Sequence, residues 1–398
     1  MALESRVRGM FRERLDDIKG KGLYRRLRTV ESAQGPWVKL EGRRVLNLCS
    51  NNYLGLAGHP AVIEAGARAM AEWGCGSGAS RSICGNMAVH ELLERRIAAL
   101  KGTESALLYT SGYTANLGII SALVGKEDYV FSDELNHASL IDGCRLSQAK
   151  VTVFPHSDLD QLEQALRRTC ERFPGGRRLI VVDGVFSMDG DLAPVTEITG
   201  LAEKFDSLLM VDEAHATGVL GPGGRGLVAS LGLEKRVPVL MGTLSKALGS
   251  FGGFAAGNRE LTEFLVNTSR SFIFTTGLPP ASAACALAAL DVLEQDTSLP
   301  FKVQENGAFL RQRLNTIGFN TLKSQTQIIP VVVGEAAGAV GMSQLLLERG
   351  VLATAIRPPT VPQGTSRIRA TVMATHTRAD LELAASAFEE AGRKVGII

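Results

Sequence analysis

One lysine stands in a setting that suits covalent chemistry. Lys246 lies in the stretch "GTLSKALGSFGG", among glycines and small or apolar neighbours, shortly after the apolar run "VPVLM". Moving an ammonium group out of water is costly, and an arbitrary lysine keeps its amine in solvent. Low solvation or a nearby cation lowers the pKa of a lysine, and only the neutral amine attacks a carbonyl carbon. The setting of Lys246 therefore fits an amine that bonds to an aldehyde, provided that other groups support it.

Four more polar side chains stand just past apolar runs that are typical of strands. Asp212 and His215 follow "SLLMV", and Ser187 follows "RRLIVVDG" within a few residues. His137 follows "DYVFSD", near the expected start of a helix. An acid at the end of an apolar strand needs a cationic or hydrogen-bonding partner. Each residue, taken alone, could serve only to stabilise the fold. The argument for a functional site therefore depends on the shared position of all four just past a strand.

A predicted helix start adds a site for an anion. Ser111, Gly112 and Tyr113 follow the run "ESALLYT" and lead into a helical pattern. Free N–H groups and the helix dipole favour a phosphate there, although Ser-Gly also caps helices without binding anything. Thr243, at the end of "VPVLMGT", adds a hydroxyl group beside Lys246.

The elements that must position these residues alternate between extended and helical patterns. Six runs are typical of strands, namely "ESALLYT", "DYVFSD", "KVTVFP", "RRLIVVDG", "SLLMVDEA" and "VPVLMGT". Apolar strands separated by helices predict an α/β fold, with a mostly parallel sheet covered by helices on both faces. In such a sheet, ligands bind beyond the carboxyl ends of the strands. We therefore expect the polar residues above to meet at one edge.

Together these groups match the requirements of pyridoxal phosphate. Its phosphate needs N–H and hydroxyl donors, its ring a flat stacking partner, and its pyridine nitrogen a carboxylate that keeps it protonated. Its aldehyde needs a lysine. The sequence therefore predicts an enzyme that uses this cofactor.

The chain is predicted to form three parts. Residues 1–50 form an N-terminal arm with an amphipathic helix and a hairpin turned at Glu41 and Gly42, and residues 51–290 form the large cofactor-binding α/β domain. Residues 291–398 form a smaller C-terminal α+β domain.

Composition favours a cytoplasmic enzyme with small-molecule substrates. The 43 Lys and Arg against 41 Asp and Glu give a net charge of +2, which provides no reason to expect a nucleic acid or a membrane surface as partner. No window reaches the roughly 18 apolar residues that span a bilayer, and the N-terminus is charged throughout. The six cysteines form no C-x-x-C pair and are expected to be reduced, and the six dispersed histidines argue against a metal site.

Two rival classes remain open. The stretch "GPGGRG" matches the glycine pattern of nicotinamide-dependent oxidoreductases, but it does not directly follow a strand. A protein kept only for binding, or as a subunit of a larger complex, would be expected to have a damaged lysine motif, whereas Lys246 is intact.

The chain resembles the α-oxoamine synthases, which are pyridoxal phosphate enzymes of fold type I. The resemblance runs from about residue 20 to 395 and rests on "SNNYLGL", "SGYTAN", "NHASL", "DGVFSMDGD", "VDEAHATG", "GTLSKALG" and "RIRATVMATHT". It implies that Lys246 bonds to the aldehyde carbon of the cofactor, that Asp212 contacts the pyridine nitrogen, and that His137 stacks on the ring. It also implies that Ser187 and His215 contact the phenolic oxygen.

The resemblance extends to the phosphate, the partner and the substrates. It assigns the phosphate to Ser111, Gly112, Tyr113 and Thr243, with Thr275 or Thr276 reaching the site of the neighbouring subunit in a homodimer. It assigns the amino-acid carboxylate to Arg369, with Asn51 beside it, and makes Arg25 and Thr360 candidates for substrate contact.

Members of this family join an amino acid to an acyl thioester and release carbon dioxide. The stretches "GSGASRSICGN" and "AIRPPTVPQGTSRIR" resemble members that use L-alanine and a pimeloyl thioester on coenzyme A or a carrier protein. The stretches "NHASLIDGCRLS" and "GTLSKALG" look at least as close to members that use glycine and acetyl-CoA. Both substrate pairs, or dual activity, stay open at this point.

Overall fold

The fold is built around a seven-stranded sheet. The structure is a computed structural model that describes residues 2–21 and 23–398. The strand order is β3-β9-β8-β7-β6-β4-β5, in which β8, β7, β6, β4 and β5 run parallel and β9 runs antiparallel to both of its neighbours. The strands are β3 (Ser105–Tyr109), β4 (Tyr129–Asp133), β5 (Lys150–Phe154), β6 (Arg178–Asp183), β7 (Leu208–Asp212), β8 (Val239–Thr243) and β9 (Gly253–Gly257). The predicted α/β class is confirmed.

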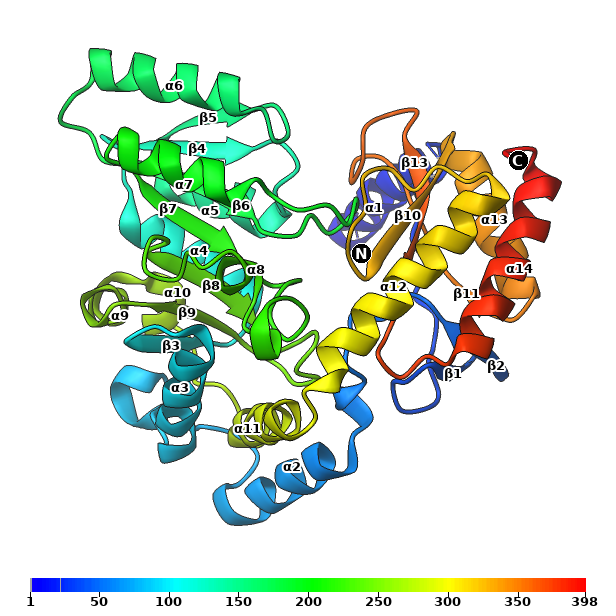
Figure 1. Ribbon diagram of the computed structural model, residues 1–398, viewed down its shortest axis with the longest axis horizontal. Coiled ribbons are helices and arrows are strands. Elements are labelled where there is room, and N and C mark those ends of the chain that lie inside the picture. Colours follow the sequence, from blue (N-terminus) through cyan, green and yellow to red (C-terminus); the bar gives the residue numbers. More distant parts are fainter. Residues whose placement is uncertain (1, 22) are drawn as a thin grey trace.

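Helices cover both faces of this sheet, as Figure 1 shows. The helices of this part of the chain are α2 (Pro60–Trp73), which packs on the outer side of α11, α3 (Ala88–Lys101), α4 (Gly112–Leu123), α5 (Ala138–Ser147), α6 (Leu159–Arg172), α7 (Val195–Lys204), α8 (Leu227–Ser230), α9 (Arg259–Thr268), α10 (Arg270–Ile273) and α11 (Pro280–Gln295), with the short helical turns η1 (Leu56–Gly58), η2 (Arg81–Gly85) and η3 (Pro222–Gly224). Neighbouring residues of β4 enter different cores. Val130 packs in the cluster that includes Leu140 of α5, and Phe131 packs in the cluster that includes Leu162 of α6. Burial on both faces explains why the inner strands β4, β6, β7 and β8 are apolar runs rather than alternating patterns. The edge strand β5 is largely exposed, and its sequence alternates.

Two small sheets lie beside the large one. One has the order β10-β13-β12, and the other has the order β1-β2-β11. Their strands are β1 (Trp37–Leu40), β2 (Arg43–Asn47), β10 (Ile328–Gly334), β11 (Val351–Leu352), β12 (Thr354–Ile356) and β13 (Ser366–Thr371), and α12 (Ser298–Ile317), α13 (Ala336–Glu348) and α14 (Arg378–Val395) pack with them. The hairpin turns at Glu41 and Gly42, both with positive φ, as expected. Because β2 pairs with β11, the hairpin of the N-terminal arm belongs to the same sheet as a C-terminal strand.

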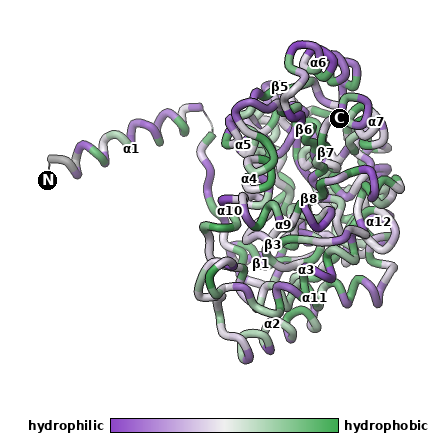
Figure 2. The backbone as a smooth tube through the Cα atoms, turned by 90° about the vertical axis from the view of Figure 1, so that its left-hand side faces the viewer, coloured by the Kyte–Doolittle hydropathy of each residue, from purple (hydrophilic) through white to green (hydrophobic). Residues whose placement is uncertain are grey.

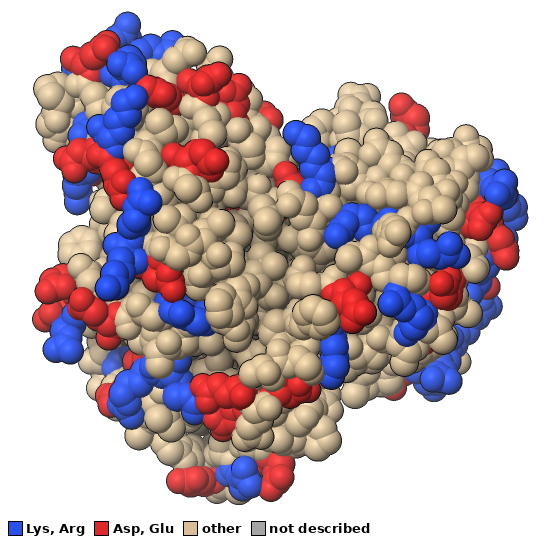
Figure 3. All heavy atoms as spheres, viewed as in Figure 1, with Lys and Arg blue, Asp and Glu red and all other residues tan. Residues whose placement is uncertain are grey.

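The first helix, α1 (Ala2–Gly20), stands apart from the rest of the chain in Figure 2. Five of its large apolar side chains are exposed, namely Val7, Met10, Phe11, Leu15 and Ile18. Within residues 2–21 and 23–398, no helix combines the length and the apolar character needed to cross a membrane. On the face drawn in Figure 3, basic and acidic side chains are interspersed, and a notch separates the two lobes at the upper edge.

Candidate active site

A cavity of about 200 Å³ lies at the carboxyl ends of β6, β7 and β8 and the start of α4. Its lining includes seven of the residues that the sequence singles out, namely Gly112, Tyr113, His137, Asp212, His215, Thr243 and Lys246. Parallel strands place their carboxyl ends at one edge, which explains how residues more than a hundred positions apart meet there.

Lys246 is half-buried, and its amine forms no hydrogen bond or ion pair with any residue that the structure describes. Burial lowers the pKa of this amine to about 8, against the opposing charges of Asp212 and Asp183, and the positive charge of Arg369 lowers it further. About a tenth of the amine is therefore neutral at pH 7, far more than for an ordinary lysine, and the neutral form is the one that acts as a nucleophile or a general base.

Asp212 ends β7 and is held from two sides. Its Oδ1 accepts a hydrogen bond of 2.8 Å from the Ala214 N–H, and its Oδ2 accepts one of 2.7 Å from Asn116 Nδ2. Asn116 also donates to Ser139 Oγ at 2.8 Å, while its own Oδ1 is buried without a partner. A carboxylate has about four acceptor sites, so Asp212 can still accept a bond from a ligand N–H.

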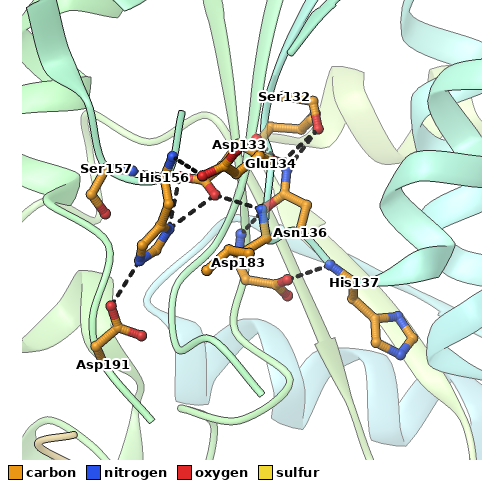
Figure 4. Close-up of polar contacts among 11 residues, drawn as sticks. Ser132, Asp133, Glu134, Asn136, His137, His156, Ser157, Asp183 and Asp191 are labelled. Atoms are coloured by element: carbon orange, nitrogen blue, oxygen red, sulfur yellow. Dashed lines mark hydrogen bonds and ion pairs between the residues drawn. The ribbon is translucent and has the colours of Figure 1, made fainter. Parts of the chain in front are cut away.

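His137 begins α5, and its backbone is anchored to the end of β6. Its N–H donates to Asp183 Oδ2 at 2.6 Å, as Figure 4 shows. Its Nδ1 lies 2.7 Å from Ser139 Oγ. Burial lowers the pKa of His137, Asp212 opposes that shift, and Lys246 adds to it. The side chain is thus a neutral, flat ring on the cavity wall.

His215 is fully enclosed and neutral. The hydroxyl of Tyr53 lies 2.6 Å from its Nδ1, and Gln327 Nε2 donates to its carbonyl oxygen at 2.9 Å. Burial holds the pKa of His215 well below its ordinary value, and the nearby charges of Lys246 and Arg369 lower it further. Its imidazole is therefore available as a neutral hydrogen-bonding group.

Arg369 reaches this region from β13 of the neighbouring sheet. Its Nε donates to the carbonyl oxygen of Ser187 at 2.5 Å, and both terminal nitrogens lie 3.3 Å from Asn51 Oδ1. These contacts hold the guanidinium in one orientation. The residue is also buried, with 8 % of its surface exposed. A planar arginine held in this way is suited to bind a carboxylate.

Arg369, Asn51 and the remaining predicted residues lie outside the cavity lining. The hydroxyl of Ser111 caps α4 by accepting from the Thr114 N–H, and Ser187 contributes its backbone carbonyl to Arg369. Thr276 is exposed and pairs with Ser80, and Thr275 precedes it. Arg25 and Thr360 are exposed.

Sequence reasoning missed four residues of this site: Tyr53, Asn116, Asp183 and Gln327. Tyr53 and Asn116 lie within the quoted stretches "SNNYLGL" and "SGYTAN", and Asp183 ends a quoted strand. A second acid at a strand end was the available signal for Asp183, which pairs in register with Asp212. Nothing local indicates Gln327, because its partner is a backbone carbonyl 112 positions away.

The fold and the site define a class of protein: an α/β enzyme with a lysine, a carboxylate and a flat imidazole at the carboxyl ends of its strands. Residues 43–388 match the family described as aminotransferase class I and II. The chain belongs to this family.

Relatives and solved structures agree with this placement. A protein of Citrifermentans bemidjiense named 8-amino-7-oxononanoate synthase is 50 % identical and aligns over 98 % of this chain and 99 % of its own. One of Geotalea daltonii with the same name is 51 % identical over 97 % and 98 %. A serine palmitoyltransferase of S. paucimobilis with a bound pyridoxal phosphate–myriocin aldimine has a TM-score of 0.92, with 33 % identity over 99 % of each chain. An 8-amino-7-oxononanoate synthase of Francisella tularensis has a TM-score of 0.75, with 26 % identity over 89 % and 99 %. The resemblance to α-oxoamine synthases is confirmed.

Proposed function

We propose that this protein condenses L-alanine with a pimeloyl thioester to give 8-amino-7-oxononanoate, carbon dioxide and the free thiol, a step of biotin biosynthesis. Full-length relatives at about 50 % identity that carry this name support the assignment. They do not favour the alternative pair, glycine and acetyl-CoA. The observation that carries the proposal within the structure is that Lys246 and Asp212 line one cavity, while Arg369 lies near enough for its charge to lower the pKa of Lys246.

The residues of the cavity fit pyridoxal phosphate. Among the described residues, the Lys246 amine has no partner, and neither do the N–H groups of Gly112 and Tyr113 at the start of α4, which can therefore meet an anion. Asp212 has free acceptor capacity. A Cβ added at Gly112 would lie 3.1 Å from Met241 Cε, so the glycine keeps the start of α4 open. We assign the covalent bond to Lys246 and the ring nitrogen to Asp212. When bound, the cofactor supplies an electron sink for the carbanion at Cα of the amino acid.

Four side chains have different roles in the proposed reaction. Arg369, held by Ser187 and Asn51, binds the carboxylate of the amino acid. Lys246, once its amine is free, takes the proton from Cα, because it is tethered at the reacting carbon and its pKa of about 8 suits a general base. His137, a flat neutral ring, packs against the ring of the cofactor. His215 forms a hydrogen bond with the phenolic oxygen of the cofactor.

We also infer a homodimer with shared active sites. Thr275 and Thr276 lie away from the cavity of their own chain and next to Phe274, a large apolar side chain that is 70 % exposed. This placement supports their reaching the phosphate in a second copy. A cytoplasmic location is part of the same proposal and is supported by the six cysteines, which all carry free thiols.

Carbon-isotope labelling tests the proposed reaction. L-alanine labelled with ¹³C at the carboxylate is incubated with pimeloyl-CoA and the cofactor-loaded protein, and the product is analysed by mass spectrometry. We expect the label to leave as carbon dioxide and the product to be unlabelled. A product that retains the label would contradict the decarboxylating condensation.

A further inference from the structure

A second cluster of titratable groups lies close to the cavity without lining it. His156, between β5 and α6, stands between two carboxylates (Figure 4). Its Nδ1 lies 3.0 and 3.2 Å from the two oxygens of Asp133, and its Nε2 lies 2.8 Å from Asp191 Oδ2. Both acids are buried, at 2 % and 8 % exposure. The imidazole therefore joins the end of β4 to the segment that follows β6.

The geometry determines the charge of this histidine. Ionised carboxylates only accept hydrogen bonds, and a neutral imidazole has one N–H, so one ring nitrogen would turn a lone pair toward an acid. The imidazolium donates at both nitrogens. Burial by itself lowers the pKa of His156, but the hydrogen bonds and charges of Asp133 and Asp191 raise it to about 10.

The surroundings of His156 support the same charge. Its backbone N–H donates to Glu134 Oε1 at 2.9 Å, and the Ser157 N–H donates to Asp133 Oδ2 at 2.8 Å. The ring packs edge-on against Phe186, with centroids 4.3 Å apart. The charged groups that face His156 are therefore the acids Asp133, Glu134 and Asp191, from two different segments.

Asp191 ends a compact loop that reaches the substrate arginine. The Phe186 N–H donates to the Asp191 carbonyl at 3.1 Å, and the Gly190 N–H donates to the Phe186 carbonyl at 2.8 Å. On the other side of this loop, the Ser187 carbonyl accepts from Arg369 Nε. The loop is thus fastened to His156 at one end and carries a contact of Arg369 in its middle.

A second link runs parallel to this one. Asp189 of the same loop forms an ion pair with Arg367, which lies two residues before Arg369 on β13. Residues two apart on a strand face the same side. The loop therefore holds two arginines of one strand face. It is itself held by the contact of Asp191 with His156 and by hydrogen bonds that the Gly190 carbonyl accepts from the Gln325 N–H and the Thr326 hydroxyl, each at 2.9 Å.

We propose that His156, as an imidazolium at neutral pH, is a positioning residue that helps to fix the loop of residues 184–191, so that the Ser187 carbonyl orients Arg369 for the carboxylate of the amino acid. The identity of that carboxylate rests on the proposed function, whereas the charge of His156 and its hold on the loop do not.

The charge is tested without any activity measurement. The protein is labelled with ¹⁵N-histidine, and the signal that disappears in His156→Gln identifies His156 by NMR. We expect both ring nitrogens to stay protonated up to about pH 9. Titration of this signal below pH 7.5 would overturn the proposal.

The positioning role is tested by separating KM from kcat. In His156→Gln and in Asp191→Asn, we expect the KM for L-alanine to rise about tenfold, since each variant removes one of the two charges that strengthen this hydrogen bond, while kcat and the cofactor spectrum change little. Asp191→Asn keeps the imidazole and serves if His156→Gln does not fold, as checked by thermal unfolding. His59→Gln, at the start of α2, is the matched control and should keep the KM of the parent protein.

The outcomes separate the two proposals. An unchanged KM in both folded variants would overturn the positioning role. Equal falls of kcat for every substrate, with KM unchanged, would overturn it too. A parent protein whose cofactor spectrum does not respond to L-alanine would contradict the proposed function, and the NMR titration would still decide the charge of His156.

Discussion

The hydroxyl of Tyr53 bridges the two sides of the active site, because it lies 2.6 Å from Nδ1 of His215 and donates to Asn51 Oδ1 at 3.0 Å. Asn51 in turn accepts from Arg369. A continuous chain of hydrogen bonds therefore joins the arginine that we assign to the amino-acid carboxylate with the imidazole that we assign to the phenolic oxygen. Burial raises the pKa of Tyr53, so the hydroxyl keeps its proton.

Tyr53→Phe tests this bridge. The ring still fills the core, but a buried hydroxyl is lost and two polar partners are left short of a hydrogen bond, which costs about 1–3 kcal/mol. We expect kcat/KM for L-alanine to fall roughly 5- to 150-fold. Tyr129→Phe is the matched control, because Tyr129 is also buried but begins β4, and its hydroxyl contacts Lys150. Equal activity of the two variants would contradict a bridging role.

Asp212→Asn separates cofactor binding from chemistry. The amide still accepts hydrogen bonds but no longer carries the charge that keeps a ring nitrogen protonated. We expect the cofactor to stay bound and turnover to fall by a factor of about 10² to 10⁴, the range for a well-placed proton-handling group. Absorbance of the bound cofactor and thiol release measure the two effects. Asp160→Asn, at an exposed position in the first turn of α6, should keep full turnover.

The pKa of Lys246 predicts a pH dependence in the cofactor-free protein. The folded value of about 8 lies below the ordinary value of 10.5, so the unfolded chain binds more protons between these two values. The cost of burying the ammonium is therefore fully present below pH 8, and this contribution to stability becomes more favourable as the pH rises from 8 to 10.5.

The same shift governs covalent capture of the cofactor. We expect the capture rate, followed by absorbance, to rise with pH and to reach half of its maximum near pH 8, because the neutral amine is the nucleophile. Lys246→Ala should bind the cofactor without forming the covalent bond. A midpoint near 10 would contradict the lowered pKa.

A buried ion pair behind the site predicts a large effect on stability. Lys101 Nζ lies 2.7 Å from Glu213 Oε2, and both side chains are almost fully buried. Lys101→Met leaves the Glu213 charge buried without its partner, which is expected to lower the free energy of unfolding by about 3–5 kcal/mol. Urea denaturation measures this change. Lys204→Met removes an exposed partner of Glu163 and should cost at most about 1 kcal/mol, and a similar loss in both variants would argue against the burial effect.

The main sheet was predictable from the sequence except at one strand. Six strands are apolar runs, and all six are present. The seventh, β9 (Gly253–Gly257), reads "GFAAG", and glycine and alanine give no strand signal. The small residues of β9 are needed because the start of α4 packs closely against this strand. A Cβ added at Gly253 would lie only 2.7 Å from Gly112 Cα.

The meeting of side chains at the candidate site could be predicted where the proposed function requires a particular residue type just past a strand. Lys246, Asp212, His137 and His215 all fall into this class. His156 and Gln327 do not, because their roles depend on partners brought together by the fold. The exposure of the apolar side chains on α1 could not be predicted either. The periodicity of the sequence predicts a helix with an apolar face, but it does not show whether another element covers that face.

The most direct test of the proposed activity is thiol release by the cofactor-loaded protein, with L-alanine plus pimeloyl-CoA compared in parallel with glycine plus acetyl-CoA. We predict fast release with the first pair and little with the second. Release chiefly with glycine and acetyl-CoA would contradict the assignment and would mean that the same scaffold serves the other substrate pair.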